Sequence, residues 1–254
     1  MDARIQQSVV ANLSSRPAPV HVGPFVVGID PATPNPGINY ATPVPGAPIT
    51  ASDVTAMVKA FQEANRQPRL EYVTGCAPGL EALLLEAGFT VEARHEYLVC
   101  LPSGLVVPPA PDGVDLRAPS TDEERAAMTS AQFEAFSGEL LSPDAVTADV
   151  ARITRLQSKG GIALMAVSTT DGTCAGGGQA VPPNDAVSEV AGIAVRVPFR
   201  RRGIAAAITA DITTRLFRAG TEIAWLEASG DDSWRIYERI GYHPTGNRLY
   251  LSRP

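Results

Sequence analysis

The stretch VAGIAVRVPFRRRGIAAAITADI, residues 190–212, passes from an apolar run to a small-residue run through three arginines and a glycine at 200–203. The first run predicts a strand and the second predicts a helix. A direct turn from strand to helix leaves free backbone N–H groups at the helix start, and these groups favour an anion together with the helix dipole. Gly203 has no Cβ, so a ligand can approach the backbone closely there. The stretch therefore predicts an anion-binding turn, with a solvated basic turn beside a small-residue helix as the alternative.

The composition is that of a globular protein and narrows the classes of function. Of the 254 residues, 44% are hydrophobic and 19% are charged, which allows a packed core. The net charge is −6 and the isoelectric point is about 5.1, which argues against nucleic-acid binding. The same charge is compatible with a cationic amine being drawn to an acidic cleft.

Neither a targeting segment nor a metal site is predicted. The first residues, MDARIQQSVVANL, are amphipathic and lack the pattern of a signal peptide. No apolar run is long enough for a transmembrane helix, so no membrane partner is expected. The cysteines at 76, 100 and 174 lie far apart without a CxxC pair, which indicates free thiols in a reducing compartment. We expect a cytoplasmic protein, whose oligomeric state the sequence does not specify.

The stretch PSGLVVPPAPDGV, residues 102–114, is rich in proline and glycine. It predicts a linker over 103–112 between two bodies, 1–102 and 113–254. Strands and helices are predicted in both bodies, which indicates an α/β (α+β) fold with a mixed, mostly antiparallel sheet flanked by helices.

Hydrophobic periodicity and turn signals place the individual elements. In the first body they predict helices over 2–14, 53–66 and 79–88 and strands over 25–29, 70–75 and 91–100. In the second body they predict helices over 122–136, 143–158, 203–219 and 232–241. Strands are predicted there over 114–118, 161–169, 173–181, 186–195, 222–228 and 246–252. The glycines at 176–178 lie inside one of these strands and indicate a bulge or a close backbone approach.

One internal repeat is visible when residues 70–100 are shifted forward by 153 positions. Gly88-Phe89 then falls on Gly241-Tyr242, and Tyr72 falls on Trp225. Both copies read as strand, helix, Gly-aromatic, strand, which favours a duplication over coincidence between two ordinary units. The first copy lacks the arginine–glycine run.

The arginine–glycine run and its surroundings resemble the GNAT superfamily of N-acetyltransferases. The signature of that superfamily is Q/R-x-x-G-x-G/A at the start of the helix after a central strand, and residues 200–205 read R-R-R-G-I-A. A second matching motif is an aromatic-bearing helix followed by Gly-aromatic, IYERIGY at 236–242. The resemblance covers about residues 113–254 and implies two GNAT-like bodies, the first a degenerate copy without the cofactor motif.

The resemblance implies that acetyl-CoA is the co-substrate, without a metal. Its pyrophosphate would lie on the amides of residues 201–206, and its pantetheine arm would pair with the backbone of the preceding strand. Arg196, Arg200 and Arg202 are candidates for charge-assisted contacts with phosphate oxygens. The complete set of implied cofactor-binding residues is Ile193, Ala194, Val195, Arg200, Arg201, Arg202, Gly203, Ile204, Ala205 and Ala206.

Two residues are candidate catalysts for acetyl transfer to a primary amine. Tyr237 matches the position of the acid that protonates the departing thiolate in the superfamily; an ordinary helix aromatic is the alternative. Glu189 is a candidate base, because strand alternation places it with Ile193 and Val195 and because a carboxylate on an apolar strand is unusual. A solvated glutamate at the strand start is its alternative, and proximity and orientation alone could supply much of the catalysis.

The sequence leaves several readings of function open. Many relatives carry an asparagine seven residues before the tyrosine, and Gly230 stands there in this chain, which mildly favours a catalytically silent acyl-CoA-binding module. The motifs G-x-G-x-x-G after a strand and G-x-x-x-x-G-K-[ST] do not occur near residue 203, which argues against other nucleotide-binding enzymes. An interaction role for the first body stays open. The acceptor is expected to be a small-molecule amine, by architectural analogy.

Overall fold

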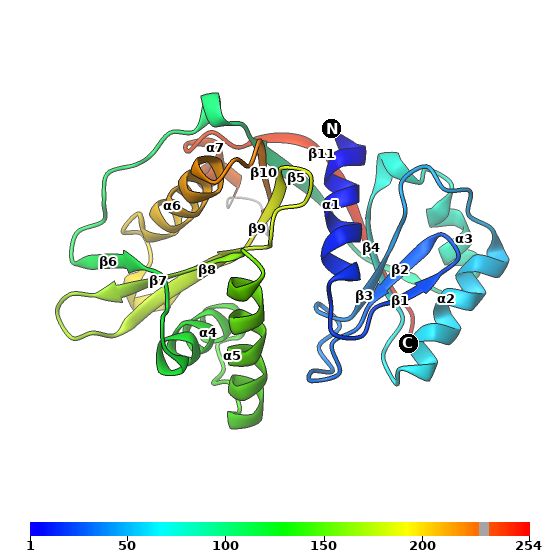
Figure 1. Cartoon of the computed structure of the whole chain (residues 1–254), viewed down its shortest axis with the longest axis horizontal. Helices are drawn as coiled ribbons and strands as arrows, with labels where there is room; N and C mark the ends of the chain where they lie inside the picture. The colour runs from blue at the N-terminus through cyan, green and yellow to red at the C-terminus, as the bar shows by residue number, and fades with distance from the viewer. Residues whose placement is uncertain (229–233) are drawn as a thin grey trace. The chain divides into compact units, whose positions relative to one another are not determined.

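The structure is a computed structural model that describes residues 1–228 and 234–254. Its contacts divide the chain into two compact units (Figure 1). Unit 1 comprises Met1–Tyr97 together with Pro244–Pro254, and unit 2 comprises Leu98–His243. The predicted fold class is confirmed, because the strands form mixed, mostly antiparallel sheet flanked by helices. Gly230 and the predicted start of the helix at 232 lie outside the described residues.

Unit 1 is built from three helices and a short-stranded sheet. Its helices are α1 (Asp2–Ser14), α2 (Ala51–Glu63) and α3 (Leu80–Glu86). Its strands are β1 (Val20–Val22), β2 (Phe25–Gly28), β3 (Tyr40–Pro43), β4 (Arg69–Val73), most of β5 (Thr90–Cys100) and most of β11 (His243–Ser252). They follow the order β1-β2-β3-β4-β11-β5, in which β3 and β4 run parallel.

The C-terminal strand β11 belongs to unit 1, although the sequence predicted it for the second body. It pairs antiparallel with β4 from Arg248, opposite Val73, to Ser252, opposite Arg69. Leu249 and Leu251 lie fully buried in the core of unit 1. The prediction assigned the strand by its place in the chain, whereas long-range burial of these leucines decides where it pairs.

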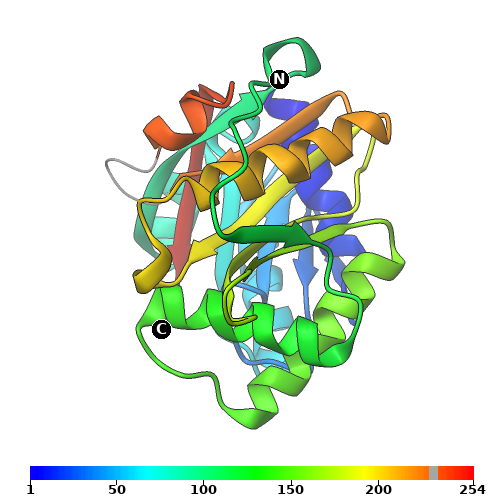
Figure 2. The same ribbon diagram turned by 90° about the vertical axis from the view of Figure 1, so that its left-hand side faces the viewer.

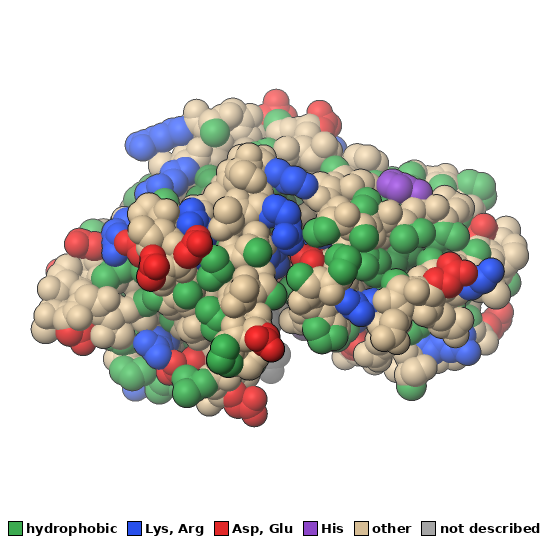
Figure 3. All heavy atoms as spheres, turned by 60° about the horizontal axis from the view of Figure 1, so that its bottom comes forward, with side chains coloured by type: hydrophobic (Ala, Val, Ile, Leu, Met, Phe, Trp, Pro, Cys, Tyr) green, Lys and Arg blue, Asp and Glu red, His purple; other side chains and the backbone are tan. Residues whose placement is uncertain are grey.

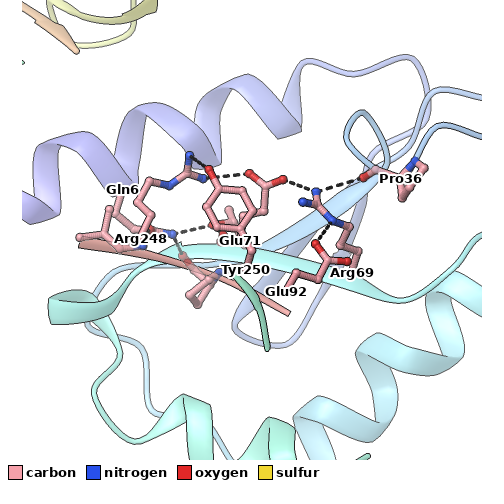
Figure 4. Close-up of polar contacts among 10 residues, drawn as sticks. Gln6, Pro36, Arg69, Glu71, Glu92, Arg248 and Tyr250 are labelled. Atoms are coloured by element: carbon pink, nitrogen blue, oxygen red, sulfur yellow. Dashed lines mark hydrogen bonds and ion pairs between the residues drawn. The ribbon is translucent and has the colours of Figure 1, made fainter. Parts of the chain in front are cut away.

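A buried cluster of charges fixes β11 in this sheet (Figure 4). Arg248 is 1% exposed, and its Nη2 lies 3.3 Å from Oε2 of Glu71 on β4. Arg69 forms a second ion pair with Glu71 and reaches Glu92 with its Nε at 2.9 Å. Both guanidinium groups stack on the ring of Tyr250, 5.4 and 5.5 Å from its centroid. The charges of the cluster therefore compensate one another within the unit.

Unit 2 holds the stretch 190–212, and its described residues form four α-helices and five strands, beside the last residues of β5. Its helices are α4 (Asp122–Ser137), α5 (Pro143–Ser158), α6 (Ile204–Arg218) and α7 (Trp234–Glu238). Its strands are β6 (Val114–Arg117), β7 (Ile162–Ser168), β8 (Cys174–Ala180), β9 (Val187–Val195) and β10 (Ile223–Glu227). They follow the order β10-β9-β8-β7-β6 and pair antiparallel, except that β10 and β9 are parallel.

Helices cover both faces of the sheet in unit 2. On one face, α6 lies across the strands (Figure 2) and buries Ile204, Ile208 and Ile212 with Val190 and Val195 of β9. On the other face, α4 and α5 bury a smaller cluster around Met128 and Ile153. Helix α4 begins in a capping box in which Thr121 and Glu124 exchange hydrogen bonds.

The predicted linker is ordered against unit 2. It begins within a 3-10 turn, Pro102–Gly104, and the Val106 N–H donates to the Ile240 carbonyl at 3.1 Å. A Cβ on Gly241 would lie 2.0 Å from the Gly104 carbonyl oxygen, so only glycine allows the two backbones to approach this closely.

Candidate active site

A cavity of about 690 Å³ lies in unit 2 at the turn between β9 and α6. It is lined by β9 with the following turn, the N-terminal end of α6, the C-terminal end of α4, α7 with the two residues after it, and Pro108. The lining side chains are mostly apolar, and its charged members are arginines. The described residues that line it are Pro108, Ala135, Phe136, Ile193, Ala194, Val195, Phe199, Arg200, Arg201, Gly203, Ile204, Ala205, Ala206, Ile236, Tyr237, Arg239 and Ile240.

One wall of the cavity is the open edge of β9. This strand pairs with β10 over Val187–Glu189 and Ile223–Trp225, and the two strands separate beyond that point. On the other edge of β9, Val190, Ala191, Ala194 and Val195 remain paired with β8. Backbone groups of the separated edge therefore face the cavity, and a ligand with amide groups can pair with them as an added strand would.

A bulge in β9 shapes this wall. Gly192 has φ +65°, and the register with β8 shifts between Gly177 and Gln179. The buried side chain of Gln132 on α4 donates from Nε2 to the Gly192 carbonyl at 2.6 Å and holds the bulge. Sequence reasoning missed Gln132; the glycine inside the apolar run VAGIAV was the signal of an irregular strand.

The glycines at 176–178 allow β8, β9 and α4 to pack closely, as predicted. A Cβ on Gly176 would lie 2.2 Å from the Ala194 carbonyl oxygen and 2.9 Å from Val195 Cα. A Cβ on Gly177 would meet Met128 Cγ at 2.5 Å, and one on Gly178 would meet Ile193 Cδ1 at 2.3 Å. These glycines therefore set the position of the cavity wall.

Replacing Gly176 with alanine should move β9 away from β8, because the clash involves backbone atoms that cannot rotate away. We expect a loss of roughly 1–3 kcal/mol in the free energy of unfolding, typical of overpacking. Urea unfolding of the variant measures this loss. Gly104→Ala is the control, since its Cβ would meet the nearest atom at an ordinary 3.7 Å. Equal stability of the two variants would contradict the close packing.

The second wall is the N-terminus of α6. Its N-cap is Gly203 in the left-handed conformation, φ +78°, and no described side chain caps the helix. The first intrahelical bond runs from the Ala207 N–H to the Gly203 carbonyl, so the amides of Ile204, Ala205 and Ala206 precede the ladder. A Cβ on Gly203 would have no described atom within 4 Å, so the space beside this N-cap residue is open. The helix start can therefore receive an anion.

The arginines of the run 200–202 have different surroundings. Arg200 donates from Nε to the Val195 carbonyl at 2.9 Å and from Nη2 to the Ala135 carbonyl at 2.8 Å. Arg202 lies outside the cavity lining, because its Nη2 donates to the Asp112 carbonyl at 3.0 Å. Arg201 has φ +62° and lines the cavity, and within the described part of the chain no side-chain partner is found for it.

Arg196, the remaining candidate for a phosphate contact, is directed elsewhere. It forms an ion pair with Glu134 on α4, and its Nη1 lies 3.4 Å from the Cys174 carbonyl oxygen. Arg196 is not among the cavity-lining residues. Its position ties α4 to the end of β9, which sequence reasoning did not foresee because Glu134 lies 62 residues away along the chain.

Tyr237 on α7 lines the cavity together with the α6 N-terminus and the β9 edge. Burial raises the pKa of Tyr237 to about 12. Its ring packs edge-on against Tyr242 at a centroid distance of 6.4 Å. The Tyr242 and Thr213 hydroxyls share a buried hydrogen bond of 2.6 Å, which anchors the supporting ring. The phenol of Tyr237 therefore keeps its proton throughout the neutral pH range.

Glu189 is not among the cavity-lining residues, and the alternation argument for it fails. Val190 and Ile193 both pack in the cluster beneath α6, although they are three residues apart. The bulge at Gly192 thus reverses the alternation, so that Glu189 and Ile193 belong to opposite faces of the sheet. Glu189 lies opposite Trp225 where β9 and β10 are still paired.

Within residues 1–228 and 234–254, no group of three or more His, Cys, Asp or Glu side chains is placed to hold a metal ion. No helix of the described chain is long and apolar enough to cross a membrane. On the face shown in Figure 3, basic and acidic side chains are interspersed.

Comparison with known proteins gives a family match and many similar structures. Residues 129–242 match the model of the acetyltransferase (GNAT) family. No curated protein matches significantly. A GCN5-related N-acetyltransferase from Kribbella flavida superposes with a TM-score of 0.80 at 27% identity, covering 100% of this chain and 96% of that chain.

Two further solved structures show the same fold. A GCN5-related N-acetyltransferase from Sphaerobacter thermophilus has a TM-score of 0.62 and 17% identity, covering 91% of this chain and 78% of that one. A tandem GNAT protein from the clavulanic acid biosynthesis pathway has a TM-score of 0.61 and 15% identity, covering 98% of this chain and 94% of that one.

Proposed function

We propose that unit 2 transfers the acetyl group of acetyl-CoA to a primary amine, since residues 129–242 match the model of the acetyltransferase (GNAT) family. The observation that carries this proposal is the common cavity: the uncapped amides of α6, the open edge of β9 and the phenol of Tyr237 all line it. The acceptor is proposed to be a small molecule that attacks directly in a ternary complex.

The lining residues fit the chemistry of acetyl-CoA. The amides of Ile204–Ala206 and the guanidinium of Arg201 supply donors and positive charge for the pyrophosphate. The backbone of Ile193 and Val195 offers strand-like hydrogen bonds to the amide groups of the pantetheine arm. One lone pair of the Val195 carbonyl is already used by Arg200, so the N–H of Val195 is its more available group.

Acetyl-CoA supplies a thioester, and each proton has a proposed path. The backbone N–H of Val195 would polarise the thioester carbonyl while the amine nitrogen forms its bond to the carbonyl carbon. The C–S bond then breaks, and Tyr237 donates its hydroxyl proton to the sulfur as negative charge develops there. The amine loses its own proton to solvent, because Glu189 lies outside the cavity lining. Tyr237 is reprotonated from solvent.

Tyr237→Phe should lower kcat and leave acetyl-CoA binding unchanged. The phenol donates only to the leaving sulfur, so its removal costs roughly 10²–10⁴-fold in turnover, as for other general acids. Titration calorimetry and release of the CoA thiol measure the two quantities on one sample. A loss of affinity equal to the loss of turnover would show that Tyr237 is a packing residue of the cavity.

The first test of the proposed function is calorimetric titration of the chain with acetyl-CoA. Saturable binding, followed by CoA release with amino acids, aminoglycosides, polyamines or peptide N-termini, would support the acetyltransferase. Binding without turnover on any of these amines would favour a silent acyl-CoA-binding module. A folded sample that does not bind acetyl-CoA at high micromolar concentration would overturn both.

Unit 1 is proposed to be a degenerate, cofactor-free copy of unit 2. Its helix α2 follows β3 as α6 follows β9, but Thr50 and Asp53 cap it. The Thr50 N–H donates to the Asp53 carboxylate at 2.8 Å, and hydrogen bonds from Thr50 lower the pKa of Asp53. A carboxylate of the chain thus lies where α6 leaves room for a phosphate.

A further inference from the structure

The cavity of unit 2 carries more positive charge than one pyrophosphate requires. Its charged lining residues are Arg200, Arg201 and Arg239, and none of the described lining residues is acidic. This concentration of positive charge stands in a chain whose net charge is −6. Uncompensated arginines around a mostly apolar cavity indicate a ligand with negative groups.

The hydrogen bonds of these arginines separate them into two kinds. Arg200 already donates to the carbonyls of Val195 and Ala135, so it holds the turn to α4 and β9. Arg201 and Arg239 are exposed, and neither has a side-chain hydrogen bond or ion pair with any described residue. These two guanidinium groups are therefore available for a ligand.

The two available arginines stand on separate segments. Arg201 belongs to the turn before α6, next to the free amides of Ile204–Ala206. Arg239 follows α7, two residues after Tyr237, and its backbone bonds to Arg235 within the same segment. CoA carries two separate anionic groups, the pyrophosphate and the 3′-phosphate of its ribose. The α6 N-terminus with Arg201 accounts for one of them.

We propose that Arg239 binds the 3′-phosphate of CoA and makes the cavity select CoA over 3′-dephospho-CoA. This inference rests on the proposed function, since it names a second contact of the same co-substrate. A guanidinium can hold a terminal phosphate through two parallel hydrogen bonds, which a single backbone amide cannot provide. Arg239 is thereby a specificity-determining residue for the acyl donor.

The test is calorimetric titration of the whole chain with CoA and with 3′-dephospho-CoA. We expect the wild type to bind CoA about 10- to 100-fold more tightly, the effect of one charge-assisted contact. Arg239→Gln should weaken CoA binding by that factor and leave 3′-dephospho-CoA binding unchanged. Arg201→Gln should weaken both ligands by a similar factor. Arg235→Gln is the matched control: Arg235 is an exposed arginine that stacks on Trp234 at 5.6 Å outside the cavity lining, so both affinities should stay unchanged.

The outcomes distinguish this inference from the proposed function. Equal wild-type affinities for the two ligands, or equal weakening of both by Arg239→Gln, would overturn the role of Arg239 and leave the acetyltransferase intact. Failure of the wild type to bind either ligand would overturn the proposed function itself. Thermal melting of each variant controls for folding, and we expect no change for Arg239→Gln because the side chain has no described partner to lose.

Discussion

Replacing Gly203 with glutamate should abolish acetyl-CoA binding. The left-handed backbone at this residue, φ +78°, costs a side chain about 1–2 kcal/mol, and the added carboxylate lies beside the amides of the α6 N-terminus. The carboxylate repels the pyrophosphate and competes for its donors. Loss of two charge-assisted hydrogen bonds corresponds to an affinity at least about 100-fold weaker. Titration calorimetry with acetyl-CoA measures this change.

Gly160→Glu is the matched control for this variant. Gly160 also has positive φ, +87°, and open space around its Cβ position, and it lies outside the cavity lining. It therefore adds the same charge and a comparable backbone strain to unit 2 without reaching the site. We expect it to bind acetyl-CoA as the wild type does. Undiminished binding by Gly203→Glu would show that the pyrophosphate of acetyl-CoA does not bind at the α6 N-terminus.

Arg248→Met should strongly destabilise unit 1. It leaves the Glu71 carboxylate, itself 6% exposed, with one of its two arginine partners. Breaking a buried ion pair from one side typically costs about 3–5 kcal/mol. The loss should appear as a lower urea midpoint for the unfolding of unit 1. Far-ultraviolet circular dichroism, which does not depend on tryptophan, measures this midpoint. Acetyl-CoA binding by unit 2 reports separately whether the cavity is still formed.

The exposed pair of Arg94 and Glu81 supplies the comparison. It lies in the same unit, but the Arg94 side chain is 54% exposed, so water replaces the lost partner. Arg94→Met should leave the free energy of unfolding nearly unchanged. The double variant Arg248→Met, Glu71→Leu removes both members of the buried pair and should recover part of the loss. Equal effects of Arg248→Met and Arg94→Met would contradict a stabilising role for the buried cluster.

Most helices and strands were predictable because their apolar periodicity is local. The sequence predicted α1 and α5 with the bounds that the structure shows, and it predicted α4 to within one residue. It missed β1, a strand of three residues that is mostly exposed and lacks an apolar pattern. The pairing of β11 was not predictable, because partner strands are chosen by burial between residues that are distant in the sequence.

The repeat seen in the sequence has a structural counterpart. The order β4, α3, β5 recurs as β10, α7, β11 at nearly the same spacing. In both units the strand before these elements pairs parallel with the first of them, β3 with β4 and β9 with β10. Descent of the two units from one duplicated ancestor stays a prediction that these parallels support.

The candidate site was predictable where it depends on backbone and not where it depends on side-chain direction. The structure brings Gly203, the β9 edge and Tyr237 to one cavity, because a strand, a turn and a helix start follow directly from the residue pattern. Arg202 and Glu189 lie outside its lining. Arg202 is held outside by its hydrogen bond to the Asp112 carbonyl, and the bulge at Gly192 decides the position of Glu189. Neither cause leaves a clear signal in the neighbouring sequence.

The course of the chain through unit 1 limits how this unit can fold during synthesis. Unit 1 breaks off at Tyr97 and resumes at Pro244, so the ribosome must make all of unit 2 before the sheet of unit 1 can receive β11. At bacterial or eukaryotic speeds this interval lasts roughly 10–30 s. During it, the nascent residues 1–97 expose β4 as an unpaired edge, which attracts other strands. The sheet of unit 1 can therefore be completed only after unit 2 has been synthesised.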